Sequence, residues 1–129
     1  DPGRVCLMDK PEDIMRLFKR AITDCDACVR YDPENKKGIS NLMTIYSAAT
    51  GKSFETIEAE FAGRGYGDFK MAVGESVVEL LRPIREEAMR LLNDKAYLQS
   101  IYEAGAQKAA FVAEKTLRKV YKKVGFVAR

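Results

Sequence analysis

The sequence predicts an all-α fold, a bundle of about five helices in a single domain. Apolar residues recur at the three- and four-residue spacing of amphipathic helices over most of the chain. Alternation of apolar and polar residues, the pattern of a half-buried strand, never persists long enough to indicate a sheet. The chain has 129 residues, 47% hydrophobic and 32% charged, which suits one globular core.

The first helix is expected over residues 11–22. Asp9 is its candidate N-cap, with Glu12 three residues later and Pro11 in the first turn. The apolar residues at helical spacing, its expected buried face, are Ile14, Leu17, Phe18, Ala21 and Ile22. A polar loop from Thr23 to Gly38 should follow, because it contains several turn-forming residues.

Two shorter helices are expected next. The segment GISNLMTIYSAATG, residues 38–51, predicts a helix capped by Ser40 or Asn41 and ended by Gly51. Ser53 is the candidate cap of a short third helix, whose apolar face consists of Phe54, Ile57 and Phe61. The glycine-rich GRGYG at residues 63–67 then predicts a tight turn.

The last two predicted helices are long. The fourth should span about residues 68–92 and kink at Pro83, because proline lacks a backbone donor and clashes with the preceding turn. Asp94 can cap the fifth, which should reach about Val124. Its expected inner stripe consists of Leu98, Ile101, Gly105, Ala109, Val112, Ala113, Thr116 and Val120. Short connections between helices favour antiparallel neighbours.

The composition leaves few routes to catalysis. The chain has no histidine, so a Ser-His-Asp or Cys-His set is impossible, and it lacks a G-x-x-x-x-G-K-[ST] phosphate loop. Cys25 and Cys28 form a Cys-x-x-Cys motif, but Cys6 is the only other thiol, which is too few for an ordinary zinc site. A thioredoxin-like role would need a βαβ context. We interpret the motif as incidental and expect a protein that acts by binding.

The bulk sequence predicts a cytoplasmic protein. Three cysteines indicate no disulfide framework, and no apolar run is long enough for a membrane span or arranged as a signal peptide. The formal net charge is only +3, so any basic binding surface must be local.

Cations gather on one side of the predicted last helix. Lys108, Lys115, Arg118, Lys119 and Lys122 fall within an arc of roughly 100° on a helical wheel, and Phe111 lies among them. An aromatic among cations can stack on a nucleobase, whereas an ordinary solvated face would show the same charges. Both interpretations stay open on the residues alone.

Several segments together resemble a known family. FKRAITD, VRYDPENKKGISNLMTIYSAATGKSFE, GYGDFK and VVELLRPIREE are similar, in order and spacing, to the C-terminal helical anticodon-binding domain of bacterial tryptophanyl-tRNA synthetases. KTLRKVYKKVGF resembles that family's last helix. The resemblance implies that residues 1–10 are the remnant of a linker and that residues 11–129 form the helical domain.

The resemblance also implies a partner and a missing activity. Enzymes of this family activate tryptophan with ATP and magnesium in a separate catalytic domain, which carries HIGH-like and KMSKS-like signatures. Neither signature occurs here. We therefore expect no cofactor in this chain, no aminoacylation by it alone, and binding to the anticodon loop of tRNA(Trp) rather than to DNA or a membrane. The isolated domain should be a monomer, and the full enzyme a homodimer.

The family also implies an RNA-binding set. The tryptophan anticodon is CCA, and the end of the first helix, here Thr23 and Asp24, approaches it in the family. Asp24 could accept a hydrogen bond from a cytosine amino group, or it could only satisfy nearby backbone amides. Arg20, Arg30 and Lys70 would hold phosphates or a base edge, Tyr31 or Tyr66 would stack, and Lys115, Arg118 and Lys122 would add cations. The alternative is a stand-alone protein-interaction or regulatory module with a basic face.

Overall fold

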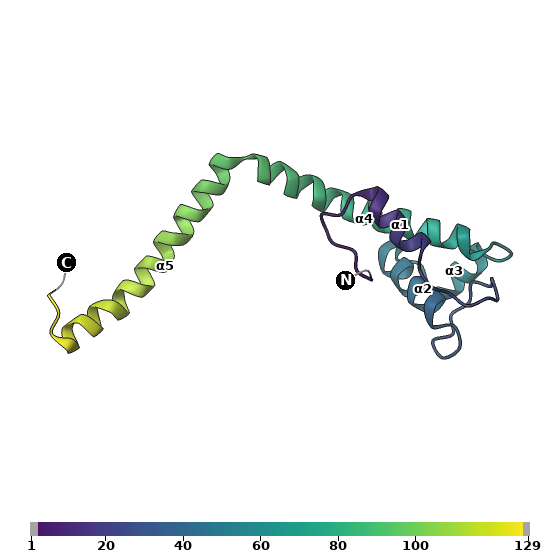
Figure 1. The fold of residues 1–129 in the computed structure, drawn as a ribbon, viewed down its shortest axis with the longest axis horizontal. Coiled ribbons are helices and arrows are strands. Elements are labelled where there is room, and N and C mark those ends of the chain that lie inside the picture. Colours follow the sequence, from purple (N-terminus) through teal and green to yellow (C-terminus); the bar gives the residue numbers. More distant parts are fainter. Residues whose placement is uncertain (1–2, 128–129) are drawn as a thin grey trace. The chain divides into compact units, whose positions relative to one another are not determined.

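The computed structural model describes residues 3–127 and contains five helices (Figure 1). They are α1 (Pro11–Lys19), α2 (Lys37–Thr50), α3 (Phe54–Glu60), α4 (Tyr66–Asn93) and α5 (Lys95–Val124). No strand occurs among the described residues, so the predicted all-α class is confirmed.

The chain divides into two compact units, residues 1–86 and residues 87–129. Residues 3–10 belong to the first unit, where Val5 packs against the core and the carbonyl of Asp9 accepts a hydrogen bond from Arg85. The predicted boundary between a linker over residues 1–10 and a helical domain over residues 11–129 stays a prediction. The outer ends of these two segments, residues 1–2 and 128–129, lie outside the described residues.

The first unit holds the hydrophobic core, where α1, α2 and α3 gather along the first part of α4 (Figure 1). The largest side chains that are fully buried come from all four helices: Ile14, Ile39, Met43, Ile57, Phe69 and Val73. Burying an aliphatic or aromatic side chain of this size contributes about 1.5–3 kcal/mol, so these positions stabilise the unit most.

Three aromatic rings lock α3 against α2 and α4. Tyr46, Phe61 and Phe69 meet edge to face, with ring centroids 4.9–5.9 Å apart for the three pairs. Such pairs add about 0.5–1.5 kcal/mol beyond their area burial. Phe61, directly after α3, is therefore held rigidly where the core reaches the surface.

The start and the end of α1 both differ from prediction. Lys10 is the N-cap residue and makes no side-chain capping bond, while Asp9 instead accepts a hydrogen bond from the Cys6 amide, 2.7 Å away. The helix ends at Lys19, and Ile22 is 89% exposed rather than part of the buried face. The chain leaves the helix early because its next residues cross directly over Gly38, where a Cβ would lie 2.2 Å from the Ile22 carbonyl oxygen.

The predicted cap of α2 was also wrong, whereas those of α3 and α5 are confirmed. The helix begins at Lys37, so Ser40 lies inside it, buried, and its Oγ accepts from the Asp32 amide at 2.9 Å. Ser53 caps α3 by accepting from Thr56, and Asp94 caps α5 by accepting from Tyr97.

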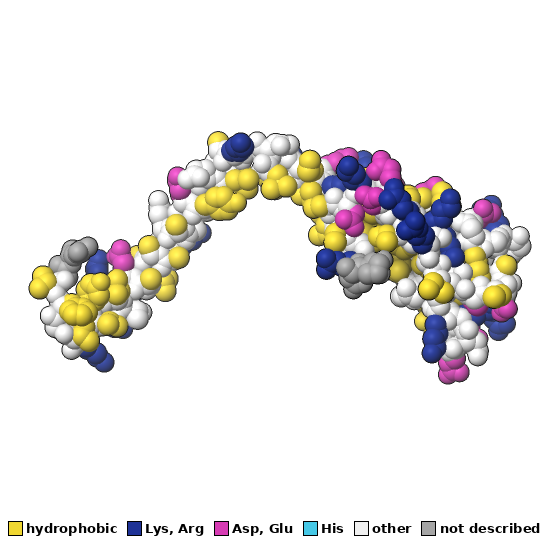
Figure 2. Space-filling view, viewed as in Figure 1, with side chains coloured by type: hydrophobic (Ala, Val, Ile, Leu, Met, Phe, Trp, Pro, Cys, Tyr) yellow, Lys and Arg dark blue, Asp and Glu magenta, His cyan; other side chains and the backbone are white. Residues whose placement is uncertain are grey.

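The second half of α4 and all of α5 bury little. Helix α4 continues through Pro83, so the proline does not divide it, and the expected kink stays a prediction. Leu80 and Ile84, in this half of the helix, are exposed. Helix α5 has no buried residue, and hydrophobic side chains are visible along it (Figure 2). Its predicted inner stripe is therefore wrong: Val112, for example, is 67% exposed. The periodicity identified an apolar face, but within the described part of the second unit, residues 87–127, nothing buries it.

Candidate nucleic-acid interface

The loop between α1 and α2 is organised around the ammonium group of Lys36. Its Nζ donates to Asp24 Oδ1 at 3.1 Å, to Asp26 Oδ2 at 2.8 Å and to the hydroxyl of Tyr66 at 3.2 Å. The Lys36 side chain is only 11% exposed. Asp26 raises the pKa of Lys36 most strongly, and hydrogen bonds to Tyr66 and Asp24 add to this shift. The lysine therefore stays charged and joins the loop to the first turn of α4.

Asp24 accepts several hydrogen bonds on a single oxygen. Its Oδ1 receives the Tyr66 hydroxyl at 2.5 Å and the Asp26 amide at 3.0 Å, besides Lys36. The Tyr66 hydrogen bond is the main cause that lowers the pKa of Asp24 from 3.8 to about 2. The other oxygen, Oδ2, is buried and has no hydrogen-bond partner among the described residues. Asp24 thus organises the loop, and its side chain as a whole is 23% exposed.

Residues 26–35 turn twice before α2 begins. Ala27 has a positive φ of 53°, the left-handed region that residues with a Cβ rarely adopt. Further along, Asp32 Oδ1 accepts from the amides of Glu34 and Asn35 at 3.1 and 3.0 Å. The hydrogen bonds from Asn35 are the main reason why the pKa of Asp32 is lowered. Local side-chain acceptors of this kind hold a loop without regular secondary structure.

The next segment lies against α3. The ring of Tyr31 stacks on that of Phe54, with centroids 3.9 Å apart and planes inclined by 9°. The amide of Tyr31 donates to Glu58 Oε1 at 2.8 Å. Tyr31 is 36% exposed, so it combines a supported ring with access to solvent. A ring held in this way suits stacking on a base, because little conformational freedom remains to be lost.

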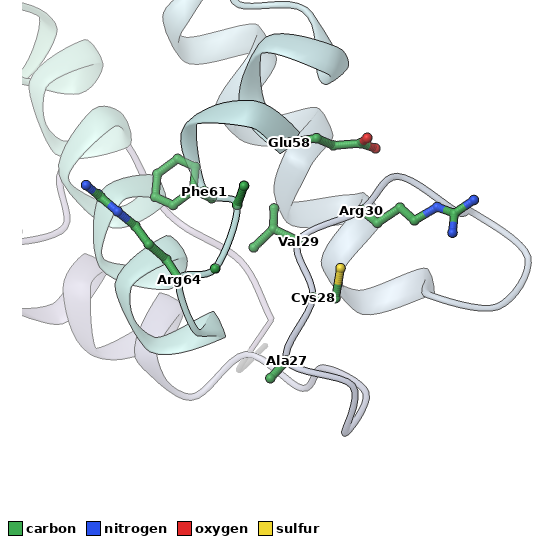
Figure 3. Close-up of a pocket in the computed structure, with 9 residues that line it drawn as sticks. Ala27, Cys28, Val29, Arg30, Glu58, Phe61 and Arg64 are labelled. Atoms are coloured by element: carbon green, nitrogen blue, oxygen red, sulfur yellow. The ribbon is translucent and has the colours of Figure 1, made fainter.

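A pocket of about 430 Å³ opens beside this stack. It lies between residues 27–30 and the end of α3, and its lining residues include Cys28, Val29, Arg30, Glu58, Phe61 and Arg64 (Figure 3). Val29 and Phe61 are buried and apolar, whereas Arg30 and Arg64 are exposed. The guanidinium of Arg64 lies 5.8 Å from the centre of the Phe61 ring. The pocket therefore joins an apolar floor to cationic side chains.

The structure distributes the predicted RNA-binding residues over both units. Arg20, Thr23, Asp24, Arg30, Tyr31, Tyr66 and Lys70 belong to the first unit, and Lys115, Arg118 and Lys122 to the second. Asp24 and Tyr66 are in direct contact, whereas Arg20 and Arg30 are exposed and Thr23 and Lys70 are half-buried. In α5, Lys115 lies 4.4 Å from the centre of the Phe111 ring, and Arg118 pairs with Glu114 at 3.2 Å. Lys122 is exposed in the last turn.

Sequence reasoning did not single out Lys36, Glu58 or Arg64. Lys36 lies in the predicted polar loop, and nothing in the local pattern indicates that its ammonium group meets a tyrosine 30 positions later. For Glu58 a signal did exist: it lies four residues after Phe54 and three before Phe61, on the same face of the third helix.

The described residues show neither a metal centre nor a membrane span. Across residues 3–127, no group of three or more His, Cys, Asp or Glu side chains could hold a metal ion. All three cysteines are free and exposed, including Cys25 and Cys28 of the Cys-x-x-Cys motif. None of the helices in the described part of the chain is long and apolar enough to cross a bilayer.

Comparison with known proteins identifies the class of protein to which this chain belongs. Residues 1–82 match the family model described as tRNA synthetases class I (W and Y), and the chain belongs to this family. The particular relatives are tryptophan–tRNA ligases. The chain is 47% identical to the one from Clostridium tetani over 125 residues, and 45% identical to the one from Wolinella succinogenes over 123 residues. These matches cover 97% and 95% of this chain and 37% of each relative, so the chain spans little more than a third of their length. The resemblance found in the sequence is confirmed.

A solved structure shares the fold. The tryptophanyl-tRNA synthetase from Mycoplasma pneumoniae superimposes with a TM-score of 0.63 at 24% identity, over 98% of this chain and 38% of that chain. At this identity the likeness concerns the fold alone.

Proposed function

We propose that this chain is the tRNA-binding part of a tryptophan–tRNA ligase and that its first unit binds the CCA anticodon loop of tRNA(Trp). The observation that carries this proposal is the ordered loop of residues 20–36. Hydrogen bonds among Asp24, Lys36 and Tyr66 hold it, and it carries the supported ring of Tyr31 and exposed arginines. Single-stranded RNA is recognised by this combination of stacking, cations and acceptors for base amino groups.

Asp24 enters the proposal in two roles. It remains a candidate acceptor for a cytosine amino group, as expected from the family. The geometry supports a second role, in which Asp24 shapes the loop through Tyr66 and Lys36. The Asp24→Asn variant should weaken binding in either case, but only direct contact predicts a selective loss of preference for cytosine.

The remaining parts of the proposal follow from the family. Tryptophan activation with ATP and magnesium would reside in the rest of the ligase, since this sequence contains neither catalytic signature. We propose the cytoplasm as its compartment. The basic residues of α5, Lys115, Arg118 and Lys122, would add non-specific attraction for the RNA backbone.

The test is a titration of a CCA anticodon stem-loop into the 129-residue chain, with a GUA stem-loop as control. Stacking contributes about 1–3 kcal/mol for each base, and a module that contacts only the loop has few phosphates to neutralise. We therefore expect micromolar or weaker affinity that falls at moderate salt. Equal affinity for the CCA and GUA loops would refute specific readout, and retention of acidic proteins but not tRNA would favour the protein-interaction alternative.

A further inference from the structure

One face of α3 carries a continuous set of features suited to a single unstacked base. Phe54, Glu58 and Phe61 lie at i, i+4 and i+7, so their side chains share this face. The segment of residues 28–31 passes beside them, with Tyr31 stacked on Phe54 and Val29 in the pocket wall next to Phe61. We call this surface, which consists of residues 28–31 with Phe54, Glu58, Phe61 and Arg64, the α3 groove.

Glu58 is a half-satisfied acceptor in the middle of the α3 groove. Its Oε1 accepts the amide of Tyr31 at 2.8 Å, which fixes the position of the carboxylate. A carboxylate has two oxygens and about four acceptor sites, so Oε2 can accept from a ligand without breaking that bond. Asp24 differs, because its Oδ1 already serves Tyr66, Lys36 and Asp26, and its Oδ2 is buried.

The pocket next to Glu58 has the size and lining for one base. Its volume of about 430 Å³ lies in the range of small-ligand sites. Phe61 and Val29 offer an apolar floor, and Figure 3 shows Arg64 and Arg30 on opposite sides of Val29. A flat base can rest on the floor while the arginines meet the phosphates on either side of it.

We propose that Glu58 is the specificity-determining acceptor for a cytosine of the anticodon and that this pocket holds that cytosine. The inference rests on the proposed function, because it assumes that an anticodon loop is the ligand. Cytosine carries an exocyclic amino donor where uracil carries a carbonyl acceptor, and a carboxylate favours the donor. The base places its amino group at Glu58 Oε2, while its ring lies in the pocket between residues 27–30 and the end of α3.

The Glu58→Gln variant gives a sharp test. The Tyr31 amide is a donor, so it holds the carbonyl oxygen of the new amide where Oε1 was and turns the NH₂ group toward the RNA. A donor then replaces the acceptor. We expect the variant to bind the CCA loop about tenfold more weakly and to prefer uracil over cytosine at one of the two cytosine positions, measured with UCA and CUA loops.

Two controls separate an effect on recognition from an effect on charge or folding. Glu75→Gln removes the same charge from an exposed position of α4 and should leave binding of the CCA loop unchanged. In the RNA, pyrimidin-2-one in place of one cytosine removes only the amino group. This change should weaken binding to the unmodified protein about tenfold but should not weaken binding to Glu58→Gln, whose NH₂ group already opposes the cytosine amino group. Thermal unfolding of each variant checks that it is folded.

The outcomes distinguish the two proposals. Equal binding of the CCA and GUA loops by the unmodified chain overturns the proposed function and this inference with it. If the unmodified chain discriminates and Glu58→Gln keeps the same ratio of cytosine to uracil affinity at both positions, only the assignment of Glu58 is overturned. If the variant does not fold, the unmodified chain still provides a test. Equal binding of the cytosine and pyrimidin-2-one loops by that chain at both positions refutes the assignment of Glu58.

Discussion

Replacing Gly38 with alanine should displace the loop that carries the candidate interface. Gly38 lies in the first turn of α2, and an added Cβ would lie 2.2 Å from the carbonyl oxygen of Ile22 and 3.2 Å from the Cα of Thr23. Both neighbours are backbone atoms, so no side-chain rotation can make room. Glycine is needed here because two segments of backbone approach each other closely.

The size of the effect can be worked from these distances. Carbon–oxygen contacts rarely fall below about 3.3 Å, so the Ile22 carbonyl would have to retreat by roughly 1 Å. Overpacking of this kind costs about 1–3 kcal/mol, and the better helix propensity of alanine returns at most about 1 kcal/mol. We therefore expect Gly38→Ala to lower the free energy of unfolding by about 1–2 kcal/mol. RNA affinity should fall as well, because Asp24 follows directly after the displaced residues.

Urea unfolding followed by near-UV circular dichroism is the suitable assay, because the packed ring of Tyr46 reports on the core of the first unit. The matched control is Gly67→Ala in the first turn of α4, where an added Cβ meets no atom within 4 Å. It should leave the midpoint unchanged or raise it. A Gly38→Ala midpoint equal to or above that of the unmodified chain would refute the claimed clash.

Three further predictions concern the loop and the pocket. Tyr66→Phe removes the main hydrogen bond to Asp24, so the pKa of that carboxyl should rise from about 2 toward 3.8, and a carboxyl-carbon NMR titration that still gives about 2 would contradict this. Because the folded pKa of Asp24 lies below its ordinary value, its contribution to stability is complete above about pH 4 and should be lost as the pH falls toward 2. Urea midpoints measured across that range should decline less steeply in Tyr66→Phe than in the unmodified chain. Arg64→Gln should reduce the salt dependence of RNA binding by about 0.7 in the logarithmic slope if it neutralises one phosphate, whereas Arg16→Gln on α1 should not change it.

The sequence was sufficient for the helices but not for their exact ends. Five amphipathic segments predicted five helices, since the spacing of apolar residues depends only on local geometry. The end of α1 could not be predicted, because it depends on the approach of Ile22 to Gly38, sixteen positions further along the chain. Ser40 was mistaken for a cap for a similar reason: its partner, the Asp32 amide, precedes the helix.

The interface was predicted in its residue types but not in its connections. Asp24 and Tyr66 were both selected, yet their hydrogen bond joins residues 42 positions apart, and no local pattern indicates such a contact. Helix α5 illustrates the opposite limit. Its apolar stripe is real, but a stripe does not indicate what covers it, and no residue of α5 is buried.

The contrast between the two carboxylates suggests how an ordered loop and a selective site can coexist in a small domain. A carboxylate that must fix a loop gains most from having its acceptor sites filled, and Asp24 has three donors on one oxygen. A carboxylate that must choose between bases needs one oxygen anchored and the other left to accept, and Glu58 fits that requirement. A single carboxylate cannot do both well, because each hydrogen bond that it accepts from the loop leaves one acceptor site fewer for the ligand. If RNA binding showed that Asp24 alone decides between cytosine and uracil, this division of roles would have to be abandoned.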